Sequence, residues 1–336
     1  MTEPTPPVPA VPDVPIRAGF VGLGVMGRAM ARRIVAAGIP LTVHSRAATA
    51  VAELVAAGAA GTGSPADVAR ASDVVVVMVP DAPDLEAVLD APDGLLAGAA
   101  DGLVIAAMGT HHPAAMPPLA AHCAERGVRL LDAPVSGGEV GAIEGSLSIM
   151  AGGDAAAFER ARPVFEAMGR TIVLVGGSGA GQMTKACNQL IVGATIAAVA
   201  EGLTLARAAG VDPAMVRTAL TGGYATSRVL DIHGGRMISR DFTPGGRAAL
   251  HAKDAHIILD TAARLGVDLP VFSVVADRFD RLVAAGRGDL DHSALITLLE
   301  DGSEAGGPAR ASDPGGPARA SDPTGPADAA DDAGRP

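Results

Sequence analysis

Short apolar runs alternate with amphipathic segments through residues 16–178, and this alternation limits the fold more than any other feature. The runs are brief, continuous and rich in Val, Ile and Leu, which is typical of buried strands. They occupy residues 16–21, 41–44, 74–79, 103–107 and 128–132. Helical patterns lie between and after them, at 27–37, 113–126 and 154–168. Because such strands are buried on both faces, we predict an α/β fold with a doubly wound parallel sheet.

The pattern changes near residue 179. No strand-like run follows, and helical periodicity continues from 181 to 209, about 29 residues or roughly 43 Å. A helix of that length leaves one compact layer, so we predict that it joins the sheet domain, 16–178, to a second, all-helical domain, 179–300. Further helices are expected at 212–221, 248–265, 270–285 and 291–300.

Both ends of the chain have compositions that cannot form a core. Residues 1–15 are rich in proline and are expected to form a disordered, extended arm. Residues 306–314 are repeated at 315–323, in a segment dominated by Gly, Pro, Ala and Asp. We therefore expect 301–336 to be a disordered tail without a catalytic role.

Composition argues against several classes of function. A net charge of −11 disfavours binding to nucleic-acid phosphates. The longest apolar stretch, 190–200, is short for a bilayer, and residues 1–15 lack the pattern of a secretory signal. We therefore expect a cytoplasmic protein that does not contact membranes. Cys123 and Cys187 share no short spacing, so we expect core residues rather than a disulfide or a zinc site.

A glycine-rich turn follows the first predicted strand and opens the first predicted helix. Gly22 permits the tight turn, Gly24 lets the backbone approach a pyrophosphate, and Gly27 lets helix and strand pack closely. Free amides at the helix start attract the anion. A plain strand–helix turn is the alternative, but the context favours a Rossmann domain. The residues expected to bind the dinucleotide are Gly22, Leu23, Gly24, Val25, Met26 and Gly27.

The end of the second strand bears on the choice of cofactor. A carboxylate here would bind the ribose 2′-hydroxyl of NAD, whereas this chain has Ser45 and Arg46. A hydroxyl and a guanidinium suit a 2′-phosphate, so NADP(H) is the preferred cofactor and NAD(H) the alternative. A surface arginine without such a role also remains open. The turn at Val79 and Pro80 is expected to contact the cofactor as well.

Two later segments carry the expected chemistry. Ser136, Gly137 and Gly138 end a strand, where ligands of open α/β sheets bind, and could hold a carboxylate. A simple glycine turn is the alternative. Lys185 lies in an otherwise uncharged helical run, and half burial against a cofactor would lower its pKa toward neutrality. It could then give a proton to a carbonyl oxygen as hydride arrives. Asn188 and Gln189, one turn on, could orient the substrate.

The histidines do not form a metal site by spacing. His111 and His112 are adjacent and so point apart, and no nearby ligand completes a site, which favours a solvated loop and no bound metal. Other histidines are scattered through the helical half: His233, His251, His256 and His292. His251 either lines the site near Lys253 or is a structural residue.

Taken together, these motifs resemble the β-hydroxyacid dehydrogenase family over about residues 16–300. Four separated motifs occur in the family's order, at 22–27, 132–138, 179–189 and 251–254. Segments 141–150, 227–230 and 291–295 look most like the branch that reduces tartronate semialdehyde. The resemblance implies a Rossmann domain, a long connecting helix and a helical domain used in homodimers or homotetramers.

The resemblance also implies roles for particular residues. Lys185 would be the general acid/base. The carboxylate of a small-molecule substrate would be held by Ser136, Gly137 and Gly138, with Asn188 or Gln189 assisting. Thr110 and Lys253 would touch the nicotinamide nucleotide, and Asp254 would steady the site.

This chain departs from the family pattern in ways that affect the substrate more than the reaction. Residues 107–110 lack one carboxylate and one hydroxyl that relatives usually carry, and Gly246 stands where relatives often have Phe. The implied function is reduction of a short semialdehyde acid, with tartronate semialdehyde to glycerate favoured. A 3-hydroxyisobutyrate dehydrogenase, or a broader hydroxyacid or imine reductase, is the alternative. A nucleotide-binding scaffold without turnover is disfavoured because Lys185 is present.

Overall fold

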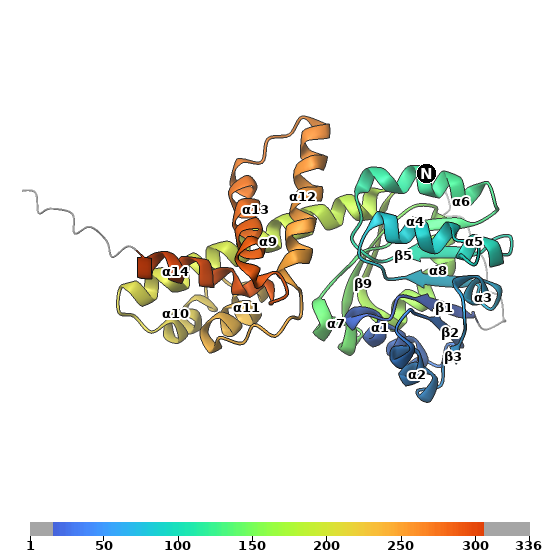
Figure 1. Ribbon diagram of the computed structural model, residues 1–336, viewed down its shortest axis with the longest axis horizontal. Helices are drawn as coiled ribbons and strands as arrows, with labels where there is room; N and C mark the ends of the chain where they lie inside the picture. Colours follow the sequence, from blue (N-terminus) through green and yellow to red (C-terminus); the bar gives the residue numbers. More distant parts are fainter. Residues whose placement is uncertain (1–15, 306–336) are drawn as a thin grey trace, which may run out of the picture.

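The computed structural model describes residues 16–305, with side chains described as far as residue 300. Figure 1 shows a sheet region and a helical region, with α9 (Ala180–Ala208) running from the first into the second. The expected proline-rich arm lies outside the described residues, as does the tail from residue 306. The last helix, α14 (Ile296–Ala305), continues past residue 300, where the tail was expected to begin.

The first region is built on one nine-stranded sheet. Its order is β3-β2-β1-β4-β5-β6-β8-β7, with β9 paired to β8. Neighbours from β3 to β6 are parallel. The strands are β1 (Ala18–Val21), β2 (Leu41–His44), β3 (Ala60–Gly61), β4 (Val74–Val77), β5 (Val104–Ala107), β6 (Arg129–Asp132), β7 (Val135–Ser136), β8 (Leu147–Gly152) and β9 (Gly169–Gly176).

The predicted α/β class is confirmed, but the sheet is not wholly parallel. The five predicted strands are present as β1, β2, β4, β5 and β6. Sequence reasoning missed β3, β7, β8 and β9, and β8 runs antiparallel to both β6 and β7. Strands β3 and β7 could not be predicted because each has only two residues, too few to show an apolar run or an alternating pattern. Residues of β9 are largely exposed at the sheet's edge, so this strand lacks the continuous burial that marks the others.

Helices cover both faces of the sheet. They are α1 (Val25–Ala36), α2 (Ala48–Ala56), α3 (Pro65–Arg70), α4 (Ala82–Asp90), α5 (Leu95–Gly98), α6 (Met116–Ala124), α7 (Gly138–Glu144) and α8 (Ala155–Met168). Strand β4 illustrates why its sequence is continuously apolar. Val74 and Val76 pack into one core cluster, and Val75 and Val77 into the cluster on the opposite face. All four are fully buried, as expected for a central parallel strand.

The second region is helical throughout the described residues. Its elements are α9, α10 (Pro213–Leu220), α11 (Arg228–Ser239), α12 (Ala248–Leu265), α13 (Pro270–Leu282), a π-helical turn at Val283–Arg287, the 3-10 helix η3 (His292–Leu295) and α14. The long helix and α12 match the predicted ranges closely. Helix α11 was not predicted, because Gly234 and Gly235 interrupt its pattern. Ser227 starts it by accepting a hydrogen bond from the Leu230 amide.

Helix α9 corrects one expectation from the sequence. Its 29 residues, with a mean hydropathy of 1.6 over the best window, are long and apolar enough to cross a membrane by length and composition. The apolar stretch at 190–200, which is too short to span a bilayer, is thus part of a longer apolar helix. Only 22% of that window is buried in the described chain, although α11, α12, α13 and α14 all pack against the helix. Much of its apolar surface therefore has no partner within the described residues.

Candidate active site

The glycine-rich turn has the geometry that a dinucleotide requires. Gly22 has a φ of +97°, in the region that favours glycine. A Cβ on Gly27 would lie 2.0 Å from the Gly22 carbonyl oxygen, so only glycine permits this contact between helix and turn. A Cβ on Gly24 would meet nothing within 4 Å, which leaves the backbone open to a ligand. The three glycines thus meet the three separate demands of the motif.

The start of α1 suits an anion. No side chain caps its amides, and its first turn holds no acidic residue. Ser45 and Arg46 follow β2, which pairs in parallel with β1, so they lie at the same edge of the sheet. Arg46 is exposed and makes no hydrogen bond or ion pair that involves another described side chain. These residues could hold the pyrophosphate and the adenosine ribose of a dinucleotide.

The loops after β4 and β5 are joined by a lysine from the helical region. Lys253 of α12 donates from Nζ to the Pro80 carbonyl at 2.7 Å and to the Thr110 carbonyl at 2.8 Å. Val79 precedes Pro80, and both lie just beyond the end of β4. The structure therefore brings Val79, Pro80, Thr110 and Lys253 together beside the turn after β1.

Lys185 is buried, with 8% of its surface exposed. Its Nζ donates to the Val135 carbonyl at 2.7 Å. Burial lowers its pKa to about 8; Asp254 opposes this shift and the positive charge of Lys253 adds to it. An amine with this pKa can give or take a proton near neutral pH.

The contact with Val135 brings Lys185 next to the predicted carboxylate clamp. Ser136 directly follows Val135 at the end of β7 and is partly exposed. Gly137 and Gly138 have φ values of +136° and +62°, and a Cβ on Gly138 would meet nothing within 4 Å. A hydroxyl and two exposed glycines therefore lie one residue from the carbonyl that holds the ammonium.

The amides and the acid predicted nearby form one chain of contacts. Asn188 donates from Nδ2 to Oε1 of Gln189 at 2.9 Å. Gln189 donates from Nε2 to Oδ2 of Asp254 at 2.6 Å. Asp254 in turn forms an ion pair with Lys253 at 3.1 Å. Gln189 thus contacts Asp254 of α12, and Asn188 reaches the same network through Gln189.

Two buried polar residues that sequence reasoning did not single out fix the start of α9. Asp132 is fully buried and accepts hydrogen bonds from the amides of Gly179, at 2.7 Å, and Gln182, at 2.9 Å. Gln182 accepts from the His111 amide at 2.9 Å and donates to the Gly109 carbonyl at 2.8 Å. Asp132 is the last residue of β6 and the first of the motif at 132–138. Its position at the end of a strand was the signal that could have identified it.

Two expectations about single residues are wrong. His111 is 1% exposed rather than solvated, because its ring packs beside Gly109. Cys187 is exposed on α9 rather than part of the core, whereas Cys123 is buried as predicted.

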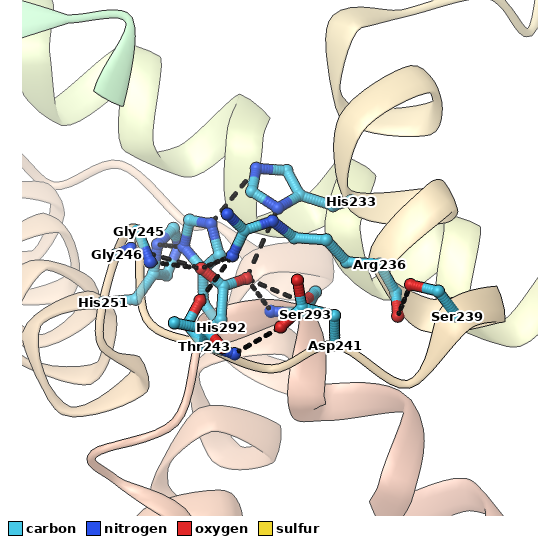
Figure 2. A network of polar contacts seen from close by, with 11 residues as sticks. His233, Arg236, Ser239, Asp241, Thr243, Gly245, Gly246, His251, His292 and Ser293 are labelled. Carbon is cyan, nitrogen blue, oxygen red and sulfur yellow. Dashed lines mark hydrogen bonds and ion pairs between the residues drawn. The ribbon is translucent and has the colours of Figure 1, made fainter. Parts of the chain in front are cut away.

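Three of the four scattered histidines, His233, His251 and His292, converge at one place in the helical region, shown in Figure 2, whereas His256 pairs with Asp280. His292 approaches His233 through the two Nε2 atoms, 3.2 Å apart, and His251 through the two Nδ1 atoms, 3.4 Å apart. Burial lowers the pKa of both His251 and His292 to about 3, so neither carries charge near neutral pH. His251 therefore belongs to a cluster of three imidazoles built from α11, α12 and η3.

His233, Asp291 and His292 have ligand atoms within 4.8 Å of one another, the spacing of a metal site. The carboxylate of Asp291, however, already pairs with Arg236 at 3.0 Å. It also accepts hydrogen bonds from the amides of Gly245, Gly246 and Ser293 and from the Ser293 hydroxyl. A divalent cation would compete with all of these donors and face the guanidinium. The cluster is thus better explained as the anchor of the loop before α12.

Comparison with known proteins gives a consistent result. Residues 17–177 match the family described as the NAD binding domain of 6-phosphogluconate dehydrogenase. Residues 179–299 match the family described as NAD-binding of NADP-dependent 3-hydroxyisobutyrate dehydrogenase. The chain is 45% identical over 285 residues to a 2-hydroxy-3-oxopropionate reductase of Escherichia coli strain K12, covering 85% of this chain and 97% of that one.

Solved structures agree with the sequence matches. A 3-hydroxyisobutyrate dehydrogenase from Salmonella typhimurium has a TM-score of 0.79 and 32% identity, and the match covers 84% of this chain and 99% of that chain. Psf3 in complex with NADP+ and 2-OPP has a TM-score of 0.78 and 27% identity, with coverage of 84% and 99%. The chain therefore belongs to the β-hydroxyacid dehydrogenase family and is an NAD(P)-dependent oxidoreductase.

Proposed function

We propose that the protein reduces tartronate semialdehyde to glycerate, with NADP(H) as the preferred cofactor. The relative from Escherichia coli named 2-hydroxy-3-oxopropionate reductase supports this choice of substrate. A reduced nicotinamide bound in the site would supply a hydride to the aldehyde carbon. Lys185 gives its proton to the aldehyde oxygen, so the carbonyl becomes a hydroxyl and both atoms of hydrogen are accounted for.

The observation that carries the proposal is the burial of Lys185 beside the segment that ends β7. Its ammonium bonds to Val135, one residue before Ser136. The Ser136 hydroxyl and the amides of Gly137 and Gly138 would hold the substrate carboxylate. A carboxylate fixed there has its aldehyde within reach of an ammonium anchored one residue away, which is the orientation that proton transfer requires. Asn188, through Gln189 and Asp254, would fix the other side of the substrate.

The domains divide this work. Residues 16–178 would bind the dinucleotide, with Gly22–Gly27 on the pyrophosphate, and residues 179–300 would complete the substrate site and form homodimers or homotetramers. The hydroxyl of Ser45 and the exposed guanidinium of Arg46 support NADP(H) over NAD(H), because no carboxylate stands there to repel a 2′-phosphate.

Steady-state assays with NADPH and NADH test the proposal. We expect the highest kcat/KM for NADPH with tartronate semialdehyde, compared with methylmalonate semialdehyde and a cyclic imine. Lys185→Met should lower kcat by about 10²–10⁴-fold and retain cofactor binding, because only the proton donor is removed. Absence of NAD(P)H oxidation with every semialdehyde would remove the proposal.

A second candidate, a dehydrogenase or imine reductase for bulkier substrates, rests on Gly246. A Cβ there would point toward the His292 ring at 3.4 Å, so the loop before α12 carries no side chain at this point. Preference for methylmalonate semialdehyde or for the imine in the same assays would favour this candidate.

A further inference from the structure

Helix α12 carries two of the proposed site residues, but its own start has no side-chain cap. Arg247 stands at the N-cap position and makes no capping hydrogen bond through its side chain. The first amides of the helix are satisfied by backbone carbonyls instead. The Ala248 amide donates to the Leu290 carbonyl at 2.8 Å. The Ala249 amide donates to the Gly288 carbonyl at 2.9 Å. The chain just before η3 therefore replaces the side chain that usually fixes the start of a helix.

Asp291 holds this part of the chain against the loop that leads into α12. Its carboxylate is fully buried. Oδ2 accepts from the Gly245 amide at 3.1 Å and from the Gly246 amide at 3.2 Å, and pairs with the Arg236 guanidinium at 3.0 Å (Figure 2). Oδ1 accepts from the Ser293 amide at 3.0 Å and from its hydroxyl at 2.7 Å. One carboxylate thus joins α11, the loop before α12 and η3.

Backbone hydrogen bonds beside the carboxylate make the loop and the cap one unit. The Asp291 amide donates to the Phe242 carbonyl at 2.9 Å, and the His292 amide donates to the Gly246 carbonyl at 2.9 Å. Asp291 also faces Arg247 in an antiparallel bridge. Because Arg247 is the N-cap residue, any shift of this unit moves the start of α12.

The first two turns of α12 carry Lys253 and Asp254 to the site. The Lys253 ammonium donates to the Pro80 carbonyl at 2.7 Å and to the Thr110 carbonyl at 2.8 Å. Asp254 accepts from Gln189 at 2.6 Å. Hydrogen bonds join successive turns of a helix, so a displacement of its start reaches these residues. A displacement of about 1 Å would stretch such short contacts beyond hydrogen-bond distance.

We propose that Asp291 is a positioning residue for the reaction, because it fixes the start of α12 and so the places of Lys253 and Asp254. It acts through these two side chains and not on the substrate. This inference rests on the proposed roles of Lys253 and Asp254 and adds to them the residue that sets their position.

Steady-state turnover of Asp291→Asn, Asp254→Asn and the double variant tests the inference, with NADPH and the semialdehyde that gives the highest kcat/KM. Asparagine keeps the shape of Asp291, but its NH2 group faces donors where an oxygen accepted. We expect Asp291→Asn to lower kcat/KM about ten- to a hundredfold, since a misplacement of about 1 Å has effects of this size. Asp254→Asn should lower it by about tenfold or more.

The double variant separates positioning from a merely structural role. If Asp291 acts through α12, the Asp254 carboxylate contributes little once the helix is displaced, because residues that act as a unit are not additive. The combined loss should then stay within about threefold of the larger single loss. A smaller folded fraction would instead multiply the two losses. Asp289→Asn is the matched control: Asp289 is 91% exposed, pairs with Arg247 at 3.3 Å and should leave kcat/KM unchanged.

Losses that multiply in the double variant, or an unchanged kcat/KM in Asp291→Asn, would overturn the inference and leave the proposed function intact. If Asp254→Asn alone has no effect, or if no semialdehyde is turned over by the wild type, the proposed site fails and the inference with it. Should Asp291→Asn not fold, Arg236→Gln takes its place in the same cycle, since it removes one partner and keeps the carboxylate. No loss, or a multiplied loss, would overturn the inference there too.

Discussion

Lys185 is the residue on which the chemistry depends most, and its environment makes a pH dependence predictable. Reduction needs the ammonium form, so kcat/KM for the aldehyde should fall as the pH rises through about 8, the pKa that burial gives Lys185. Oxidation of the hydroxy acid needs the neutral amine and should rise through the same pH. Initial rates in both directions between pH 6 and 10 check this.

The control for this pH dependence is Asp254→Asn. The carboxylate of Asp254 raises the pKa of Lys185, so its removal should move both midpoints to lower pH. If both directions responded to pH in the same sense, or if the midpoint were unaffected in Asp254→Asn, proton transfer by Lys185 would not explain the profile.

Single residues could be predicted from the sequence where a residue type and its place in a motif imply the same backbone conformation. The spacing of Gly22, Gly24 and Gly27 predicted three different backbone demands, and each is met. It failed for His111, because neighbouring residues in a sequence do not reveal which of them faces a core. The ring packs beside Gly109 and interacts with Asp81, which follows another strand, and no local pattern contains the second of these contacts.

At the scale of elements, the start of α9 determines where Lys185 lies. Asp132 accepts from two amides of the first turn, and Val135, three residues later, accepts from the Lys185 ammonium. The segment that ends β6 and forms β7 therefore fixes both the helix and its reactive group. Gly181 fits only because it has no side chain, since a Cβ would lie 2.4 Å from the Met150 carbonyl oxygen.

We expect Asp132→Ala to lower the free energy of unfolding by about 2–4 kcal/mol, because two buried amides lose their acceptor. It should also lower kcat, since the first turn of α9 and Lys185 lose their anchor.

Asp154→Ala is the matched control: Asp154 caps α8 by accepting from the Ala157 amide at 2.9 Å but is exposed. That variant should cost about 1 kcal/mol and leave kcat unchanged. Equal effects in the two variants, measured by denaturant unfolding and turnover, would contradict a special role for Asp132.

The elements themselves could be predicted unevenly. The ranges of long helices such as α9 and α12 could be predicted closely, because the helical period repeats over many residues. The edge of the sheet could not be predicted in the same way: β7 has two residues, and its pairing with β8 depends on a contact between Ser136 and Ser148 set by the whole fold. The imidazole cluster is a further example, since His233 and His292 lie 59 residues apart.

At the scale of the whole molecule, α9 presents an uncharged stripe along one side of the helical region. Spacings of three, four and seven residues keep its members on one face, and all are exposed. They are Cys187, Ile191, Ala198, Gly202 and Leu205. Its two large apolar members are Ile191, which is 62% exposed, and Leu205, which is 72% exposed. An exposed apolar stripe is typical of surfaces that pack against a second chain, and small residues within it would let a second helix approach closely.

This stripe predicts that the protein forms homodimers or homotetramers through α9. Burying Leu205 fully would contribute about 1.5–3 kcal/mol, and a carboxylate in its place would add a desolvation cost. Leu205→Glu should therefore raise the dissociation constant at least about tenfold, seen by sedimentation or light scattering as a shift toward single chains.

Leu265→Glu, a change at a leucine that is 63% exposed on α12, is the matched control and should keep the assembly. Dissociation in both variants would mean that added charge, and not the α9 stripe, is responsible; an unchanged assembly in Leu205→Glu would place the interface elsewhere.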